Sequence, residues 1–205
     1  MEQIFFLVVL LFSAVFHEYM HGWAALQMGD HTAKDLGRLT LNPLVHIDPI
    51  MTVLLPALLY FTTQGQFMFA AAKPVPFNPY NLRYPRYGPA LVGLAGPIGN
   101  FIIAIIFAII LRLGFLSGQL VMAAFIIIFA NVTLAIFNLV PIPPLDGSHI
   151  LTALLPQRMV AVTAFYERYG YFIFIFFLIF FVPAIFPVIS FVTRILIGPN
   201  IALTP

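Results

Sequence analysis

The sequence predicts an all-α polytopic membrane protein with about five transmembrane helices, one of them short or re-entrant. A small extended or β element is expected in the loop after the second helix. Hydrophobic residues make up 62% of the 205 residues and charged residues only 8%, against roughly a quarter in ordinary soluble domains. Several apolar runs approach the ~20 residues that cross a bilayer. We therefore expect one membrane-embedded domain over residues 1–205.

The predicted helices follow the apolar runs in order. The first is expected from about Ile4 to Met28 as a retained helix, because no positive n-region or clear cleavage site marks a signal peptide. The second, Ile50–Thr62, contains Pro56 and is shorter than a normal span, so it is either tilted or partly inserted. Two full-length helices are expected at about Ala90–Phe115 and Gln119–Val140.

Proline sets the remaining boundaries. The stretch QGQFMFAAAKPVPFNPYNLRYPRYGP contains five prolines, too many for a helix, while its first part, Gln66–Ala71, suits an extended strand. After PIPPLDG, a short helix is expected from about Ser148 to Pro156. The last apolar region, Tyr169–Ile197, is interrupted by Pro183 and Pro187, which predicts one spanning helix and a short terminal one.

Charge and cysteine content exclude several functions. The net charge is +2, and the nine lysines and arginines are scattered singly, so nucleic-acid binding is not supported. Their even distribution between the loops also leaves the membrane orientation open. The chain has no cysteine, so thiolate catalysis is excluded and only His, Asp and Glu remain as metal ligands.

The stretch AVFHEYMHGW places ionisable residues where they are costly, inside the first apolar helix. His17 and His21 are four residues apart, about 400° around a helix, so both imidazoles leave the same face and can share one ion. Glu18 lies about 60° around from His21, within reach of a water on that ion. The pattern predicts a metal site with an adjacent general base.

A catalytic zinc needs a third protein ligand and an open position. Asp146 is the leading candidate, because it follows three prolines that let its carboxylate turn inward. Its ordinary interpretation is an N-cap for the helix that follows. The residues alone leave five candidates open: Asp146, Glu167, Asp48, His46 and His149.

Five ordered motifs resemble the site-2 proteases, a family of intramembrane zinc metalloproteases, in a compact bacterial form without a PDZ or CBS domain. The motifs are FHEYMHGWAA, GRLTLNPLVHIDP, AAKPVPFNP, AGPIGN and NLVPIPPLDG. They form a core over residues 16–147, and the C-terminal helices of residues 148–205 add little. The chain departs from the family where a glycine often follows HIDP, since Ile50 and Met51 stand there.

The resemblance implies roles for individual residues. His17, His21 and Asp146 would bind one Zn²⁺ per chain, and Glu18 would be the general base. Asn138 matches an active-site asparagine that contacts the substrate or the oxyanion, although a polar residue at that position also suits interhelical packing.

The implied activity is hydrolysis of peptide bonds in or near transmembrane segments, known as regulated intramembrane proteolysis. The implied location is the bacterial inner membrane, and the implied substrates are single-span regulators such as anti-sigma factors, or remnant signal peptides. The segment from Gln66 to Val75 is predicted to hold the substrate by β-augmentation. The sequence does not indicate an oligomeric state.

Two other functions remain open. The first is a non-catalytic membrane protein that binds or transports a metal, in which ligands would be spread across the membrane. The second is a prenyl protein endopeptidase of the zincin type, whose third ligand would have to be Glu167, since Glu2 and Glu18 are the only other glutamates.

Overall fold

The computed structural model describes residues 2–62, 64 and 72–198, and every regular element in these ranges is a helix. The all-α prediction is therefore confirmed for the described part of the chain. The main helices are α1 (Glu2–Gln27), α4 (Gly88–Arg112), α5 (Gln119–Asn138), α7 (Val160–Phe180) and α8 (Val182–Ile197). Shorter α-helices are α2 (Thr32–Asp35), α3 (Leu55–Thr62) and α6 (Gly147–Leu154), and the remaining turns are 3₁₀ helices at Pro43–His46, Pro79–Asn81 and Gln157–Met159 and a π-helix at Pro49–Leu54.

Within the described ranges, four helices are long and apolar enough to cross a membrane: Ile4–Gln27, Gly88–Arg112, Gln119–Asn138 and Ala161–Phe180. The helix Val182–Ile197 is apolar but shorter. Their outward faces carry large apolar side chains such as Phe172 and Ile179, both well exposed. Such faces suit contact with lipid tails, in agreement with a multi-pass membrane protein.

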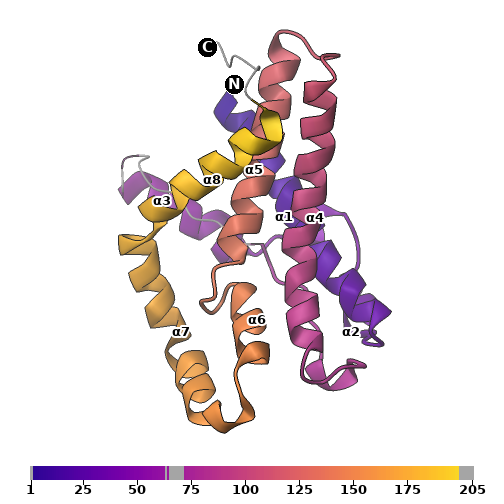
Figure 1. Ribbon diagram of the computed structural model, residues 1–205, viewed down its shortest axis with the longest axis vertical. Helices are drawn as coiled ribbons and strands as arrows, with labels where there is room; N and C mark the ends of the chain where they lie inside the picture. Colours follow the sequence, from indigo (N-terminus) through magenta and orange to yellow (C-terminus); the bar gives the residue numbers. More distant parts are fainter. Residues whose placement is uncertain (1, 63, 65–71, 199–205) are drawn as a thin grey trace.

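Helices α1, α4 and α5 pack together as the centre of the molecule, and α6 lies against α4 (Figure 1). Helix α8 runs obliquely across α5 and also contacts α4. The core between α4 and α5 contains the small residues Ala104, Ala108 and Ala124 beside Ile128. Small side chains let membrane helices approach closely, which fixes α4 relative to the helices on either side of it.

The C-terminal boundaries differ from the prediction. Helix α7 begins at Val160, nine residues before Tyr169, because hydropathy had marked only its most apolar part and no helix breaker lies between these positions. Pro183 stands in the first turn of α8, where its missing N–H costs nothing. The expected break at Pro187 is wrong, because α8 continues through it and loses only one hydrogen bond to its first turn.

The second predicted helix, Ile50–Thr62, corresponds to the π-helix and α3 together. It is shorter than a normal span of about 20 residues, and its tilted or partly inserted placement stays a prediction. The predicted strand Gln66–Ala71 lies outside the described residues. Residues 72–78 are described, and they form no strand.

Candidate metal centre

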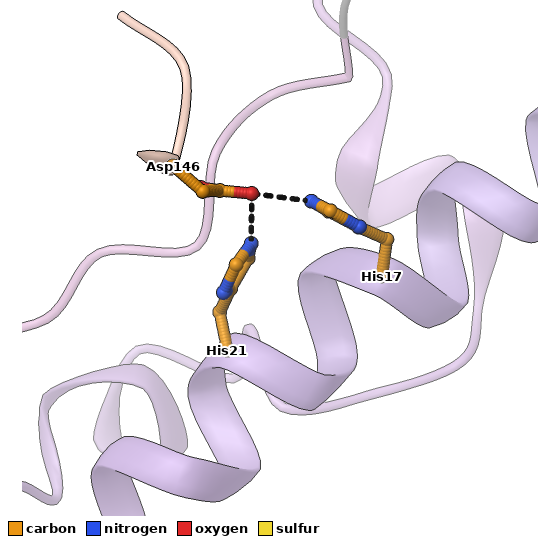
Figure 2. A group of neighbouring side chains, drawn as sticks. All are labelled: His17, His21 and Asp146. Atoms are coloured by element: carbon orange, nitrogen blue, oxygen red, sulfur yellow. Dashed lines mark hydrogen bonds and ion pairs between the residues drawn. The ribbon is translucent and has the colours of Figure 1, made fainter. Parts of the chain in front are cut away.

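Helix α1 presents His17 and His21 to one carboxylate that comes from the turn between α5 and α6. Asp146 Oδ2 lies 3.0 Å from His17 Nε2 and 3.3 Å from His21 Nε2 (Figure 2). The ligand atoms of these three residues all lie within 4.8 Å of one another. The structure thus brings together the two histidines of the motif and the carboxylate 125 positions beyond His21 (146 − 21).

Each imidazole is held from behind by a hydrogen bond at Nδ1. His17 Nδ1 donates to Asn100 Oδ1 at 2.6 Å, and His21 Nδ1 donates to the Val92 carbonyl at 2.7 Å, both on α4. A proton on Nδ1 leaves Nε2 as the lone-pair donor, and ligating histidines in metal sites are oriented in this way. With Nδ1 engaged in this way, Nε2 is the ring nitrogen left to bind a metal.

Asp146 occupies the N-cap position of α6, yet its side chain makes no capping hydrogen bond. Its carboxylate is directed to the histidines instead, so the N-cap interpretation does not describe what the side chain does (Figure 2). The next residue must be glycine, because a Cβ on Gly147 would lie 2.3 Å from the Leu139 carbonyl oxygen and 2.5 Å from that of Val140. This close turn over the end of α5 delivers Asp146 to α1.

Gly96 on α4 makes room for both imidazoles. A Cβ at this position would lie 2.5 Å from His21 Nε2 and 2.6 Å from His17 Cε1, distances that side chains do not tolerate. The glycine of the AGPIGN motif therefore allows α4 to lie directly against the two histidines, because a small residue permits close helix approach.

The three side chains fit a zinc ion by chemistry and by spacing. Zinc takes imidazole nitrogen and carboxylate oxygen at about 2.0–2.2 Å, and ligands in tetrahedral arrangement are then about 3.3 Å apart. The separations of 3.0 and 3.3 Å from the Asp146 oxygen to the two nitrogens match this spacing. Three protein ligands leave one position open, as in catalytic sites.

Glu18 does not join this group of three. Its Oε2 accepts a hydrogen bond of 2.7 Å from the backbone N–H of Val75. Val75 lies in the segment of residues 72–78, which precedes α4. The sequence did not predict this contact. Glu18 and Val75 are 57 positions apart, and neither the motif around Glu18 nor the proline-rich segment around Val75 indicates that the two meet.

A buried polar network continues from His17 into the helix bundle. Asn100 Nδ2 donates to the Ser13 carbonyl at 3.2 Å and to Asn131 Oδ1 at 2.8 Å, and Asn131 Nδ2 donates to Ser13 Oγ at 2.9 Å. Both asparagines have no exposed surface. They join α1, α4 and α5 and orient His17.

Asn138, the predicted substrate contact, lies at the last residue of α5. Its Nδ2 donates to the Leu134 carbonyl of its own helix at 2.9 Å. The structure gives it no hydrogen bond to the three clustered residues, and its role stays a prediction.

The other candidates for a third ligand lie elsewhere. Glu167 is exposed on α7, where it lines a cavity of about 280 Å³ together with Arg86. His46 is buried with its Nε2 donating to the Thr40 carbonyl at 2.9 Å, and Asp48 accepts from the Ile50 amide at 2.9 Å. His149, on α6, packs edge-on against the Phe77 ring, with centroids 6.0 Å apart.

The fold and the site define a multi-pass membrane protein with a metal-binding group of two histidines and one aspartate. Peptidase family M50 matches residues 112–181, which include Asp146 but neither histidine. "Putative zinc metalloprotease YwhC" of Bacillus subtilis is 38% identical over 180 residues, covering 83% of this chain and 78% of YwhC. A protein described in the same words, Rip2 of Mycolicibacterium smegmatis, is 29% identical over 174 residues, covering 83% of this chain and 65% of Rip2.

A further relative, "Zinc metalloprotease MJ0392" of Methanocaldococcus jannaschii, is 32% identical over 76 residues, covering 37% of this chain and 22% of MJ0392. No solved structure matches significantly. The likeness to YwhC extends over most of both proteins, so the chain belongs to peptidase family M50, the site-2 protease family. This confirms the family predicted from the five motifs, and membership makes the chain a metalloprotease.

Proposed function

We propose that this chain is a zinc metalloprotease that hydrolyses peptide bonds in or near the transmembrane segments of other membrane proteins. The proposal depends on one observation: the Nε2 atoms of His17 and His21 both lie next to the same carboxylate oxygen, Asp146 Oδ2. Relatives named as zinc metalloproteases support zinc as the ion. The chemistry of the ligand set agrees with that choice.

The depth of the site supports cleavage within the bilayer. His17 lies 13 residues from Ile4, the start of the apolar span, and 10 residues from Gln27, its end. At 1.5 Å per residue these separations are about 20 Å and 15 Å, near the middle of a hydrocarbon core of about 30 Å. A peptide bond of a membrane-embedded substrate can reach that depth without leaving the membrane.

The residues of the site divide the chemistry between them. Zinc bound there would supply a Lewis acid that polarises the scissile carbonyl and acidifies a water molecule. Asn100 and Val92 hold the histidine rings with Nε2 facing Asp146. Glu18 is the general base, which accepts a proton from water and passes it to the leaving amine.

The substrates proposed are single-span membrane proteins such as anti-sigma factors, or remnant signal peptides, in the bacterial inner membrane. A helical substrate must unwind, because its carbonyls are otherwise hidden in backbone hydrogen bonds. Transport of a metal is less well supported, since the described part of the chain contains one group of metal-binding residues and no series of them across the membrane.

Glu18→Gln tests the proposal on purified protein in micelles with a single-span substrate. We expect zinc to be retained and cleavage to fall about 100- to 10,000-fold, the usual contribution of a general base. Glu167→Gln is the matched control, because it removes an exposed carboxylate on α7 and should change neither property. A wild type that cleaves no substrate, or a Glu18→Gln variant as active as wild type, would refute the protease.

A further inference from the structure

The segment of residues 72–78 lies directly over the motif helix. Val75 is buried and its Cγ1 would lie 2.9 Å from a Cβ on Gly22, the residue that follows His21. The absence of a side chain at Gly22 lets the backbone of this segment approach α1. Its position brings main-chain groups to the level of the metal-binding residues.

Three contacts hold this segment in place upstream of Val75. Arg38, a buried arginine, donates through Nη2 to the carbonyls of Lys73 and Pro74 at 2.8 and 3.2 Å. The Lys73 amide donates to the His46 carbonyl at 2.8 Å. Because both carbonyls accept from one buried guanidinium nitrogen, the backbone is held at two adjacent residues, Lys73 and Pro74.

Two prolines isolate the amide that meets the catalytic helix. Pro74 and Pro76 have no N–H, so Val75 is the only amide donor between Lys73 and Phe77. That single donor makes the 2.7 Å hydrogen bond to Glu18 Oε2. Both prolines also restrict the backbone of their preceding residues to extended conformations, which keeps the Val75 N–H directed at α1.

We propose that the Val75 backbone amide is a positioning group for Glu18. This inference rests on the proposed function, in which Glu18 is the general base. A glutamate side chain has three rotatable bonds, and an N–H that fixes one carboxylate oxygen leaves the other in a defined place to accept a proton. A base displaced by about 1 Å can cost about 100-fold in rate, so the fixed amide contributes to turnover and not to substrate affinity.

The same contacts argue against substrate pairing at this point of the segment. Pairing with a substrate strand requires free main-chain donors and acceptors. The amides of Lys73 and Val75 and the carbonyls of Lys73 and Pro74 are already hydrogen-bonded within the protein. Of these groups the Val75 amide is bonded to Glu18, and the others are bonded to His46 and Arg38.

Amide hydrogen exchange tests the contact without any catalysis. We expect the Val75 amide to exchange at least about 10-fold faster in Glu18→Ala than in wild type, while the Lys73 amide, bonded to His46, keeps its rate. Asp35→Ala removes an exposed carboxylate of α2 and is the control that should change neither amide. An unchanged Val75 rate in Glu18→Ala overturns the proposal.

Kinetics of two Val75 variants test the consequence. Val75→Pro removes the N–H, and Val75→Ala keeps it while removing the packing on Gly22. We expect Val75→Pro to lower kcat about 100-fold with KM within about twofold and zinc retained, and Val75→Ala to lose less than about 10-fold. Equal losses in both variants, or a loss confined to KM, overturn the proposal. A wild type that never cleaves overturns the proposed function, a result that the exchange experiment distinguishes from a missing contact.

Discussion

His17 on α1 donates through Nδ1 to Asn100 Oδ1 on α4 at 2.6 Å, inside the helix bundle. The amide of Asn100 is oriented by its own two hydrogen bonds, to the Ser13 carbonyl and to Asn131, so its oxygen can only face the imidazole. The asparagine thereby fixes both the ring orientation and the tautomer of His17. A polar residue inside an apolar membrane helix is costly unless its polar groups are hydrogen-bonded, as those of Asn100 are.

Replacing Asn100 should weaken zinc binding although Asn100 touches no metal. Asn100→Leu leaves the Nδ1 of His17 without an acceptor, and loss of such a partner typically lowers metal affinity 10- to 100-fold. Zinc titration of the purified apoprotein measures the change. Thr133→Val is the control, because Thr133 donates only to the Phe129 carbonyl of its own helix. Equal affinities in wild type and Asn100→Leu would contradict the role given to Asn100.

Gly96 and Gly99 on α4 offer a matched pair for testing close approach. Gly96→Ala forces a methyl group against the rigid imidazoles of His17 and His21, and should cost about 1–3 kcal/mol in stability with most of the zinc lost. Gly99→Ala meets chiefly Met20, whose flexible side chain can move, although Cγ is 2.6 Å away. Zinc content per chain and thermal unfolding measure both effects. We expect Gly99→Ala to retain zinc, and similar zinc contents in the two variants would refute the assignment.

The sequence located the first half of the site by itself. The four-residue spacing of His17 and His21 defines a shared face wherever the segment is helical, and its apolar surroundings predict that helix. The third ligand depends on how α5 and the turn after it pack against α1, which no local pattern specifies. Residue chemistry therefore left five candidates, among which the preceding prolines favoured Asp146, and the family resemblance then selected it.

The sequence predicted neither the contact of Glu18 with Val75 nor the first residues of α7, because side-chain patterns and hydropathy carry no signal for them. The Val75 amide is a backbone group, and backbone donors carry no signature in the side-chain pattern. The first half of α7 contains Glu167 and Arg168, which lower the hydropathy without lowering the helix propensity. The apolar run therefore begins at Tyr169, although the helix begins at Val160. Hydropathy locates membrane burial, and it marks helix ends only where a breaker coincides with them.

Asp146→Asn and Glu167→Gln distinguish the two families of metallopeptidase that the sequence allowed. Asp146 Oδ2 lies beside both Nε2 atoms, whereas Glu167 is exposed on α7. We expect Asp146→Asn to lower zinc affinity at least about 100-fold, because an amide oxygen is a poorer zinc ligand than a carboxylate. Glu167→Gln should retain one zinc per chain by elemental analysis. Zinc loss in Glu167→Gln with retention in Asp146→Asn would transfer the third ligand to α7.

Asp30 ties the end of α1 to the segment that carries Val75, and this tie should depend on pH. Its carboxylate accepts from Thr32 N and Oγ1 at 3.2 and 2.5 Å, from Asn78 N at 2.6 Å and from Asn81 Nδ2 at 3.0 Å. Burial alone would raise the pKa of Asp30, but the hydrogen bonds from Thr32, Asn81 and Asn78 outweigh it and hold the pKa below its usual 3.8. The ionised form is therefore the one that the fold stabilises.

Because the pKa of Asp30 is lower in the folded state, its contribution to stability is complete above the unfolded pKa and is lost as the pH falls through the folded pKa. Asp30→Asn should lower the free energy of unfolding by about 2 kcal/mol at pH 7, since hydrogen bonds to a charged group are replaced by weaker ones. The difference in unfolding temperature between wild type and variant should shrink as the pH is lowered below about 4. Asp35→Asn, at an exposed position of α2, should differ from wild type at neither pH. If the difference in unfolding temperature between wild type and Asp30→Asn stays constant as the pH falls from 7 to below about 4, the charge of Asp30 is not what stabilises the fold.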